Sequence, residues 1–218
     1  MSINKLLCAV SVLACVGTAP ALADDDHGNK YGNNECPVGL VTGKTLDEEF
    51  GLGTQEKTEC LKRRHNVKMV VQINAFCATA TPNASCTRPY ALGNIRNIID
   101  DYEITHGMKA GRDYEIVAII HSGGGFMALK NEGYNGNGDL VTGRNQFEGL
   151  VSSLMDKGVK FYFCQNTTRA YIGNNILPAA NETPGGANAE VIPGMLYTTA
   201  GLTSLADFQS RGYQYIQP

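Results

Sequence analysis

Two residues that could do chemistry each follow an apolar run typical of a buried strand. Cys164 closes the run 159–163, and His121 follows the run 116–120. A cysteine thiolate is a nucleophile, and a histidine can transfer a proton or hydrogen-bond to a sulfur atom. Because ligands of parallel α/β sheets bind at the carboxyl ends of the strands, both residues are candidate catalytic groups. The alternative for His121 is a strand-end histidine whose hydrogen bonds go to the backbone.

A helix directly after Cys164 could activate its thiol. Residues 167–172 predict a short helix capped by Asn166 or Thr167, and the positive end of its dipole would stabilise a thiolate. Arg169, one turn into this helix, could add positive charge. We therefore expect Cys164 to be unpaired, close to water and anionic. The alternative is a buried cysteine that only fills the core.

The residues after His121 could bind a ligand through their backbone. The three glycines 123–125 could expose N–H groups that bind an anion, or they could be a flexible turn. The candidate ligand-binding residues are Ser122, Gly123, Gly124, Asn166 and Thr167.

The number of cysteines in the mature protein depends on the N-terminus. Residues 1–23 have the pattern of a cleaved secretory signal, with an apolar run at 6–16 and small residues at Ala21 and Ala23. An uncleaved anchor, or a lipoprotein attached through Cys15, is the alternative. Cleavage leaves an odd number of cysteines, which in an exported protein indicates a free thiol or an intermolecular partner. These cysteines are Cys36, Cys60, Cys77, Cys86 and Cys164.

The simplest disulfide pairing joins neighbours in the sequence and leaves Cys164 free. It links Cys36 to Cys60 and Cys77 to Cys86, although the other connectivities remain open. Closing loops of this size typically contributes about 2–4 kcal/mol in an oxidising compartment. We predict that residues 24–66 form an N-terminal extension with a disulfide and that residues 67–218 form the folded domain.

The elements that must position these residues alternate between strand and helix. Strands are predicted at 67–73, 114–121, 159–163 and 213–216, with a weaker one at 190–192. Helices are predicted at 45–50, 90–106, 146–157, 167–172 and 203–210, and a polar loop at 131–143. The alternation predicts a mainly parallel five-stranded sheet in a three-layer α/β/α sandwich.

Composition and spacing exclude several functional classes. The chain has 218 residues, is 43% hydrophobic and carries a formal net charge of −3, which fits a globular domain without a basic surface for nucleic acid. The segment 39–45 is one residue short of a phosphate-binding loop, and neither cysteine pair has the spacing of a zinc site. We expect no cofactor, no metal, no nucleic-acid partner and no membrane association after signal cleavage.

From Val67 to Ile216 the chain resembles the DsrE/DsrF-like proteins, which include the TusD-type sulfur carriers. The resemblance rests on the strand ending His121-Ser-Gly, on 158–169 with its strand-end cysteine, and on the closing segment 202–216. It implies a flavodoxin-like or Rossmann-like single domain, commonly a homo-oligomer, in which the strand-end cysteine carries persulfide sulfur. That role maps onto Cys164. The chain departs from the family pattern in its export signal, its N-terminal extension and its loop between Cys77 and Cys86.

Three functions are compatible with these features. The first is a periplasmic, sulfurtransferase-like carrier of sulfane sulfur on Cys164, tuned by His121 and Arg169. Its partner would be a sulfur donor or acceptor protein, or a small sulfane-sulfur species. The second is a non-catalytic module that binds a small ligand or a protein at the strand ends. The third is an assembly component in which Cys164 is only part of the core.

Overall fold

The computed structural model describes residues 38–57, 66–77 and 86–218, which all belong to one compact unit of the chain. The expected signal at 1–23 and the expected disulfide between Cys36 and Cys60 lie outside the described residues.

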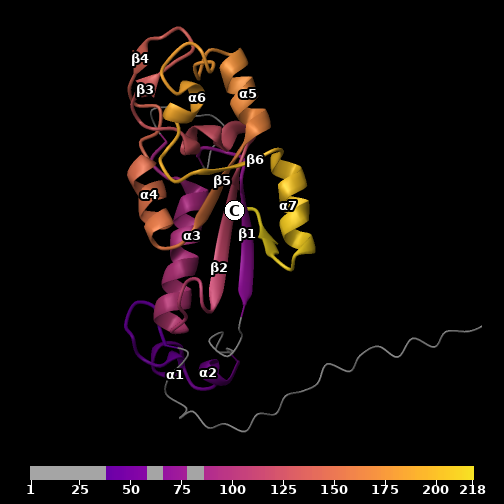
Figure 1. Cartoon of the computed structure of the whole chain (residues 1–218). Coiled ribbons are helices and arrows are strands. Elements are labelled where there is room, and N and C mark those ends of the chain that lie inside the picture. Colours follow the sequence, from indigo (N-terminus) through magenta and orange to yellow (C-terminus); the bar gives the residue numbers. More distant parts are fainter. Residues whose placement is uncertain (1–37, 58–65, 78–85) are drawn as a thin grey trace, which may run out of the picture. The chain divides into compact units, whose positions relative to one another are not determined.

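A five-stranded parallel sheet forms the centre of the domain (Figure 1). Its strand order is β6-β5-β2-β1-β7, and every neighbouring pair is parallel. The strands are β1 (Val67–Ile73), β2 (Tyr114–Ile120), β5 (Lys160–Cys164), β6 (Leu196–Thr198) and β7 (Gln214–Ile216).

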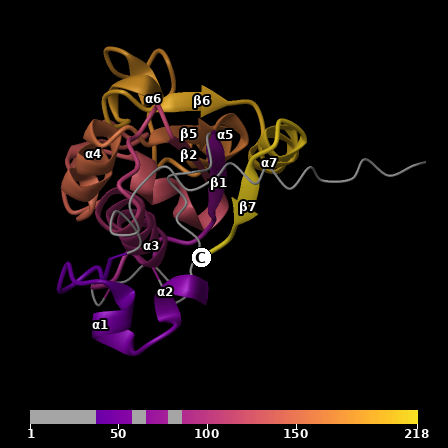
Figure 2. The same ribbon diagram turned by 90° about the horizontal axis from the view of Figure 1, so that it is seen from below.

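Helices cover both faces of this sheet, so the domain is the predicted three-layer α/β/α sandwich of Rossmann or flavodoxin type. Helices α3 (Tyr90–Asp100) and α4 (Glu148–Asp156) pack on one face, and α7 (Gly201–Ser210) packs on the other (Figure 2). Helix α5 (Gln165–Gly173) follows β5 directly. The central strands are apolar on both faces because helices cover both.

Alternate residues of each strand divide the core into two clusters. Met69, Ile116 and Phe161 belong to the larger cluster under α3 and α4. Val70 and Val117, together with the residues Ile119, Leu205, Phe208 and Tyr213, form the smaller cluster under α7. The sheet face under α7 therefore has a smaller buried apolar cluster than the face under α3 and α4.

The fifth strand is not where the sequence analysis placed it. Residues 190–192 form only an isolated bridge, between Leu129 and Val191, and the edge strand is instead β6. The backbone of this segment bonds to residues 128–130 instead: the N–H of Lys130 donates to the carbonyl of Glu190 at 2.9 Å, and the N–H of Ile192 donates to the carbonyl of Ala128 at 2.9 Å. The side chain of Glu190 forms a buried ion pair. Arg144 Nη2 lies 2.9 Å from Glu190 Oε2, and the two side chains are only 4% and 6% exposed. The same carboxylate accepts the backbone N–H of Tyr134 at 2.7 Å.

Several other expected boundaries move by a few residues. The helix expected at 90–106 is α-helical only to Asp100 and continues as a π-helix over Asp101–Thr105. The loop 131–143 contains a small antiparallel hairpin, β3 (Gly133–Tyr134) with β4 (Leu140–Val141). The helix expected at 45–50 is α1 (Leu46–Phe50), which Thr45 caps through its side chain. Two further helices are short, α2 (Thr54–Lys57) and α6 (Gly186–Ala189).

The expected disulfide between Cys77 and Cys86 is confirmed. It joins the chain just beyond β1 to the chain just before α3, at the carboxyl edge of the sheet. Within the described ranges, no helix is both long enough and apolar enough to span a membrane.

Candidate functional site

One polar or thiol-bearing residue from each strand, or from directly after it, lines the carboxyl edge of the sheet on the α7 face. Because side chains alternate along a strand, residues two apart share a face. Gln72 is two residues from Val70, and His121 is two residues beyond Ile119, both in the cluster under α7. The residues at this edge are Tyr215, Gln72, His121, Cys164 and Thr198.

The described cysteine that is free, Cys164, is the last residue of β5. The backbone N–H of Gly201, the first residue of α7, donates a hydrogen bond to Sγ of Cys164 at 3.2 Å. The expectation of a thiol close to water is wrong, because Cys164 is 3% exposed beneath the start of α7. The N–H donor also comes from α7 and not from the helix directly downstream.

That downstream helix, α5, begins earlier than expected. Cys164 itself occupies the N-cap position, so Asn166 and Thr167 lie inside the first turn and neither caps the helix. Arg169 is exposed and its guanidinium donates to the side chain of Asn166. The hydroxyl of Thr167 is buried and accepts the backbone N–H of Ser122 at 2.9 Å. The side chains of Arg169 and Thr167 therefore bind Asn166 and Ser122, and not the thiol of Cys164 as expected.

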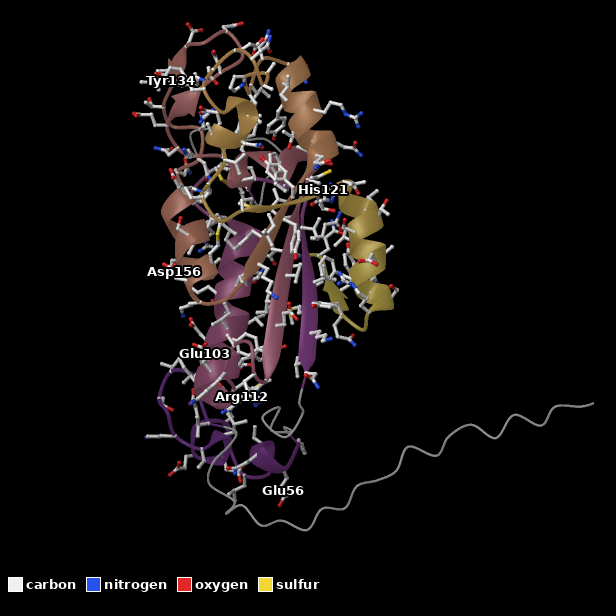
Figure 3. The ribbon with its side chains drawn as sticks, in the orientation of Figure 1. Glu56, Glu103, Arg112, His121, Tyr134 and Asp156 are labelled. Carbon is white, nitrogen blue, oxygen red and sulfur yellow. A yellow bond between two sulfur atoms is a disulfide. The ribbon has the colours of Figure 1, made fainter. Side chains whose placement is uncertain are left out.

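His121 and Cys164 meet at the first residue of α7. Their strands pair in parallel register, with Ile120 opposite Phe163, so the next residue of each strand is a cross-strand neighbour. A Cβ atom built on Gly201 would lie 2.9 Å from Cβ of His121, whereas the N–H of Gly201 contacts the sulfur. Figure 3 labels His121 between the sheet and the start of α7. The structure thus brings the two predicted catalytic residues together.

His121 is buried and its two ring nitrogens both have partners. Nδ1 lies 2.9 Å from Oγ of Ser122, and Nε2 lies 2.7 Å from Nε2 of Gln72. Burial lowers the pKa of His121, because an imidazolium loses its hydration in this position. The backbone is therefore not the main partner of this ring, and the neutral imidazole is the form that the site favours.

The glycines after His121 belong to a short helix and not to a flexible turn. Ser122–Ala128 is a 3₁₀ helix, and the N–H of Gly124 is already bonded to the carbonyl of His121 at 3.0 Å. A Cβ on Gly124 would lie 2.4 Å from the carbonyl oxygen of Ile73, so the close packing of this helix on β1 requires glycine. Ser122 and Gly123 remain exposed.

Ser122 adopts a backbone conformation that is rare for a residue with a side chain. Its φ is +51°, in the left-handed region. Hydrogen bonds on both sides hold it there: its N–H donates to Thr167, and its carbonyl accepts the hydroxyl of Tyr171 at 3.4 Å. Such conformations persist only when their surroundings enforce them, and they occur often at functional sites.

Gln72 and Tyr215 were not predicted from the sequence. The hydroxyl of Tyr215 donates to Oε1 of Gln72, which is 7% exposed. A sign was present in the sequence, because Gln72 interrupts the otherwise apolar end of the run Met69–Ile73. Its partners lie too far away in sequence for any local pattern to indicate them.

Hollows near this edge are small. A cavity of about 210 Å³ at the end of β1 is lined by Gln72, Asn74, Tyr90 and Pro218, among others. Among the described residues, no group of three or more histidine, cysteine or acidic side chains is arranged to hold a metal ion.

Comparison with known proteins adds little on function. No protein-family model matches the chain, and a search of curated proteins gave no match. The solved structures that match include a protein of unknown function from Methanobacterium thermoautotrophicum. It is 20% identical, with a TM-score of 0.45, and the match covers 71% of this chain and 99% of that one.

Proposed function

We propose that this protein carries sulfane sulfur as a persulfide on Cys164, in the manner of the DsrE/DsrF-like carriers that its sequence resembles. Its donor and acceptor are carrier proteins or small sulfane-sulfur species, and it works as an exported, periplasmic homo-oligomer. The observation that supports the proposal best is the N–H of Gly201 directed at Sγ of Cys164.

That hydrogen bond favours the reactive form of the thiol. An N–H donor stabilises a thiolate more than a thiol, because hydrogen bonds to ionised acceptors are stronger than those to neutral ones. Gly201 begins a ten-residue helix, so the positive end of the helix dipole acts in the same direction. The thiolate is the form of cysteine that attacks sulfur.

The proposed reaction is an exchange between sulfur atoms without net oxidation. The thiolate of Cys164 attacks the terminal sulfur of a donor R–S–SH, forming a new S–S bond while the donor S–S bond breaks. The products are the persulfide of Cys164 and the thiolate R–S⁻, which carries away the displaced electron pair. In the second step, an acceptor thiolate attacks the outer sulfur of the persulfide and regenerates the thiolate of Cys164.

The burial of the sulfur means that transfer requires the start of α7 to move. Thr199, two residues before Gly201, and Leu202, directly after it, are exposed, and Leu202 is 69% exposed. A displacement of this first turn would uncover the sulfur without disturbing Leu205 and Phe208, which anchor the rest of the helix in the core.

Mass spectrometry of the native protein after exposure to polysulfide tests the proposal. We expect an adduct of about 32 Da on the peptide that contains Cys164, removable by dithiothreitol. Cys164→Ser should show no such adduct at this position, and its unfolding should indicate whether the fold is intact. If native protein gains no adduct while denatured protein is modified at Cys164, the thiol is a core residue and the proposal fails.

The second candidate function is binding without chemistry, and the 3% exposure of Cys164 favours it. A ligand or protein partner would then contact the exposed groups at the same edge, which include Ser122, Gly123 and Asn166. Retention of a partner by Cys164→Ser, with no sulfur adduct on the wild-type protein, would support this function over sulfur transfer.

Export and assembly have their own tests. Cleavage after residue 23 predicts that the intact mass of the exported protein begins at Asp24. Sedimentation equilibrium of this mature form measures whether it is a homo-oligomer, and a monomer would remove that part of the proposal.

A further inference from the structure

A chain of side-chain hydrogen bonds leads from the protein surface to His121. The hydroxyl of Tyr215 on β7 donates to Oε1 of Gln72 on β1. Nε2 of Gln72 lies 2.7 Å from Nε2 of His121, and Nδ1 of His121 lies 2.9 Å from Oγ of Ser122. Gln72 and His121 are 7% and 8% exposed, whereas Tyr215 at the outer end is 39% exposed.

The chemistry of each group gives this chain a direction. The carboxamide oxygen can only accept, so a tyrosine hydroxyl that donates to Oε1 turns the amino group of Gln72 toward the imidazole. That amino group can only donate, so Nε2 of His121 must be the acceptor. The ring proton of a neutral imidazole then lies on Nδ1, which donates to Ser122.

We infer that Gln72 and Tyr215 are positioning residues that hold His121 as the neutral Nδ1–H tautomer beside Cys164. The tautomer is inferred from the donation of the Tyr215 hydroxyl to Gln72, whereas its importance for sulfur transfer rests on the function proposed above.

This arrangement excludes His121 as the base that takes the proton of Cys164. With both ring nitrogens engaged, His121 neither accepts the proton of Cys164 nor forms an imidazolium–thiolate pair. Both hydrogen-bond partners of the ring, the amide of Gln72 and the hydroxyl of Ser122, are uncharged. The N–H of Gly201 is then the group that stabilises the thiolate. His121 lies so close to Gly201 that a Cβ there would be 2.9 Å from its Cβ.

A reversed chain is the competing arrangement, and it has a distinct signature. Tyr215 also lies 3.1 Å from Oε1 of Gln217, to which its single hydroxyl proton could be donated. Gln72 would then be turned over, with its oxygen accepting a hydrogen bond from the Nε2–H of His121. The reversed chain therefore predicts the Nε2–H tautomer.

Long-range ¹H–¹⁵N correlation spectra of the imidazole rings distinguish the two tautomers. The chain has four histidines, and the spectrum of His121 is identified by its loss in His121→Asn. We expect Nδ1–H for the wild type at neutral pH and a shift toward Nε2–H in Gln72→Leu. Gln72→Glu should place a proton on Nε2, because a carboxylate can only accept.

Tyr215→Phe keeps the inference testable even if Gln72→Leu does not fold. It removes one hydroxyl at a partly exposed position and should release Gln72 to turn over, giving a mixture of tautomers. Tyr134→Phe, also at an exposed tyrosine, is the matched control and should leave the His121 spectrum unchanged. An Nε2–H wild type, or a tautomer that is unaffected by both Gln72→Leu and Tyr215→Phe, would overturn the inference.

The pH profile of Cys164 alkylation connects the tautomer to the thiol. The wild-type profile should contain no step from a histidine, because both ring nitrogens of His121 are engaged. In Gln72→Glu a carboxylate next to Nε2 favours the imidazolium beside the thiol and should make alkylation faster at neutral pH. If the tautomer is as expected and polysulfide leaves no adduct on Cys164, the positioning role stands and the proposed function fails. If polysulfide leaves the adduct on Cys164 and the tautomer is not the expected one, only the positioning role fails.

Discussion

The contact between Gly201 and His121 makes Gly201→Ala the most informative single substitution. A Cβ at this position would lie 2.9 Å from both Cβ and Cγ of His121 and 3.0 Å from Cδ2. Ordinary carbon–carbon contacts are longer than this by about half an ångström. His121 has little freedom to move away, because Gln72 and Ser122 hold both of its ring nitrogens.

Two opposing effects set the expected change in stability. Overpacking a well-filled site costs about 1–3 kcal/mol, whereas alanine favours a helix interior over glycine by up to about 1 kcal/mol. Gly201 is the first residue of α7, where the helix preference for alanine is smaller than in the interior. We therefore expect Gly201→Ala to lower the free energy of unfolding by about 1–2 kcal/mol.

Urea unfolding with the disulfide intact measures this change. A loss of this size corresponds to a midpoint lower by about 0.5–1 M, for a denaturant dependence of about 2 kcal/mol per molar. Gly93→Ala is the matched control, because Gly93 lies within α3 and a Cβ there would have no neighbour within 4 Å. It should raise the free energy of unfolding by about 0.5–1 kcal/mol.

The same variant also reports on the thiol. A displaced start of α7 weakens the hydrogen bond to Cys164 and exposes the sulfur, so alkylation of native Gly201→Ala should be faster than that of the wild type. A midpoint equal to or above that of the wild type, with unchanged alkylation, would refute the described contact between α7 and His121.

Two further predictions concern buried charge. Glu190→Gln leaves the guanidinium of Arg144 buried without its counter-ion and should cost about 3–5 kcal/mol of unfolding free energy, measured by urea unfolding. Lys157→Gln, which breaks the more exposed pair with Asp100, should cost less than about 1 kcal/mol, and equal losses would contradict the difference in burial. Because burial lowers the pKa of His121, the unfolded chain binds its proton more readily. The contribution of His121 to stability should therefore be complete above the ordinary pKa of 6.5 and decline as pH falls below it; His121→Asn should remove this part of the pH dependence.

The main features of the fold could be predicted from the sequence. Residues 67–73 and 114–120 are strands because nearly continuous apolar runs of this length suit strands buried on both faces. The helical periodicity of Ile95 and Ile99, which face the core, located α3. Strand β6 was missed because a three-residue edge strand that is only partly buried has no apolar run to reveal it.

The candidate site was only partly predictable. The positions of His121 and Cys164 at strand ends follow from local sequence, and so does their common edge in a parallel sheet. The N–H that bonds to the sulfur could not be predicted, because it belongs to Gly201, 37 residues later in the chain. Gln72 could be noticed in its apolar strand, but its role could not be inferred.

Local sequence alone thus determined which segments are strands and helices and which reactive side chains stand at the ends of strands, because these depend on hydrophobic periodicity and on neighbours along the chain. Tertiary structure decided that α7 covers the sulfur and that Tyr215 reaches Gln72 from 143 residues away. These contacts arise from the order of the strands in the sheet, with β7 placed beside β1. That order is set by the packing of the whole domain and leaves no trace in any one segment.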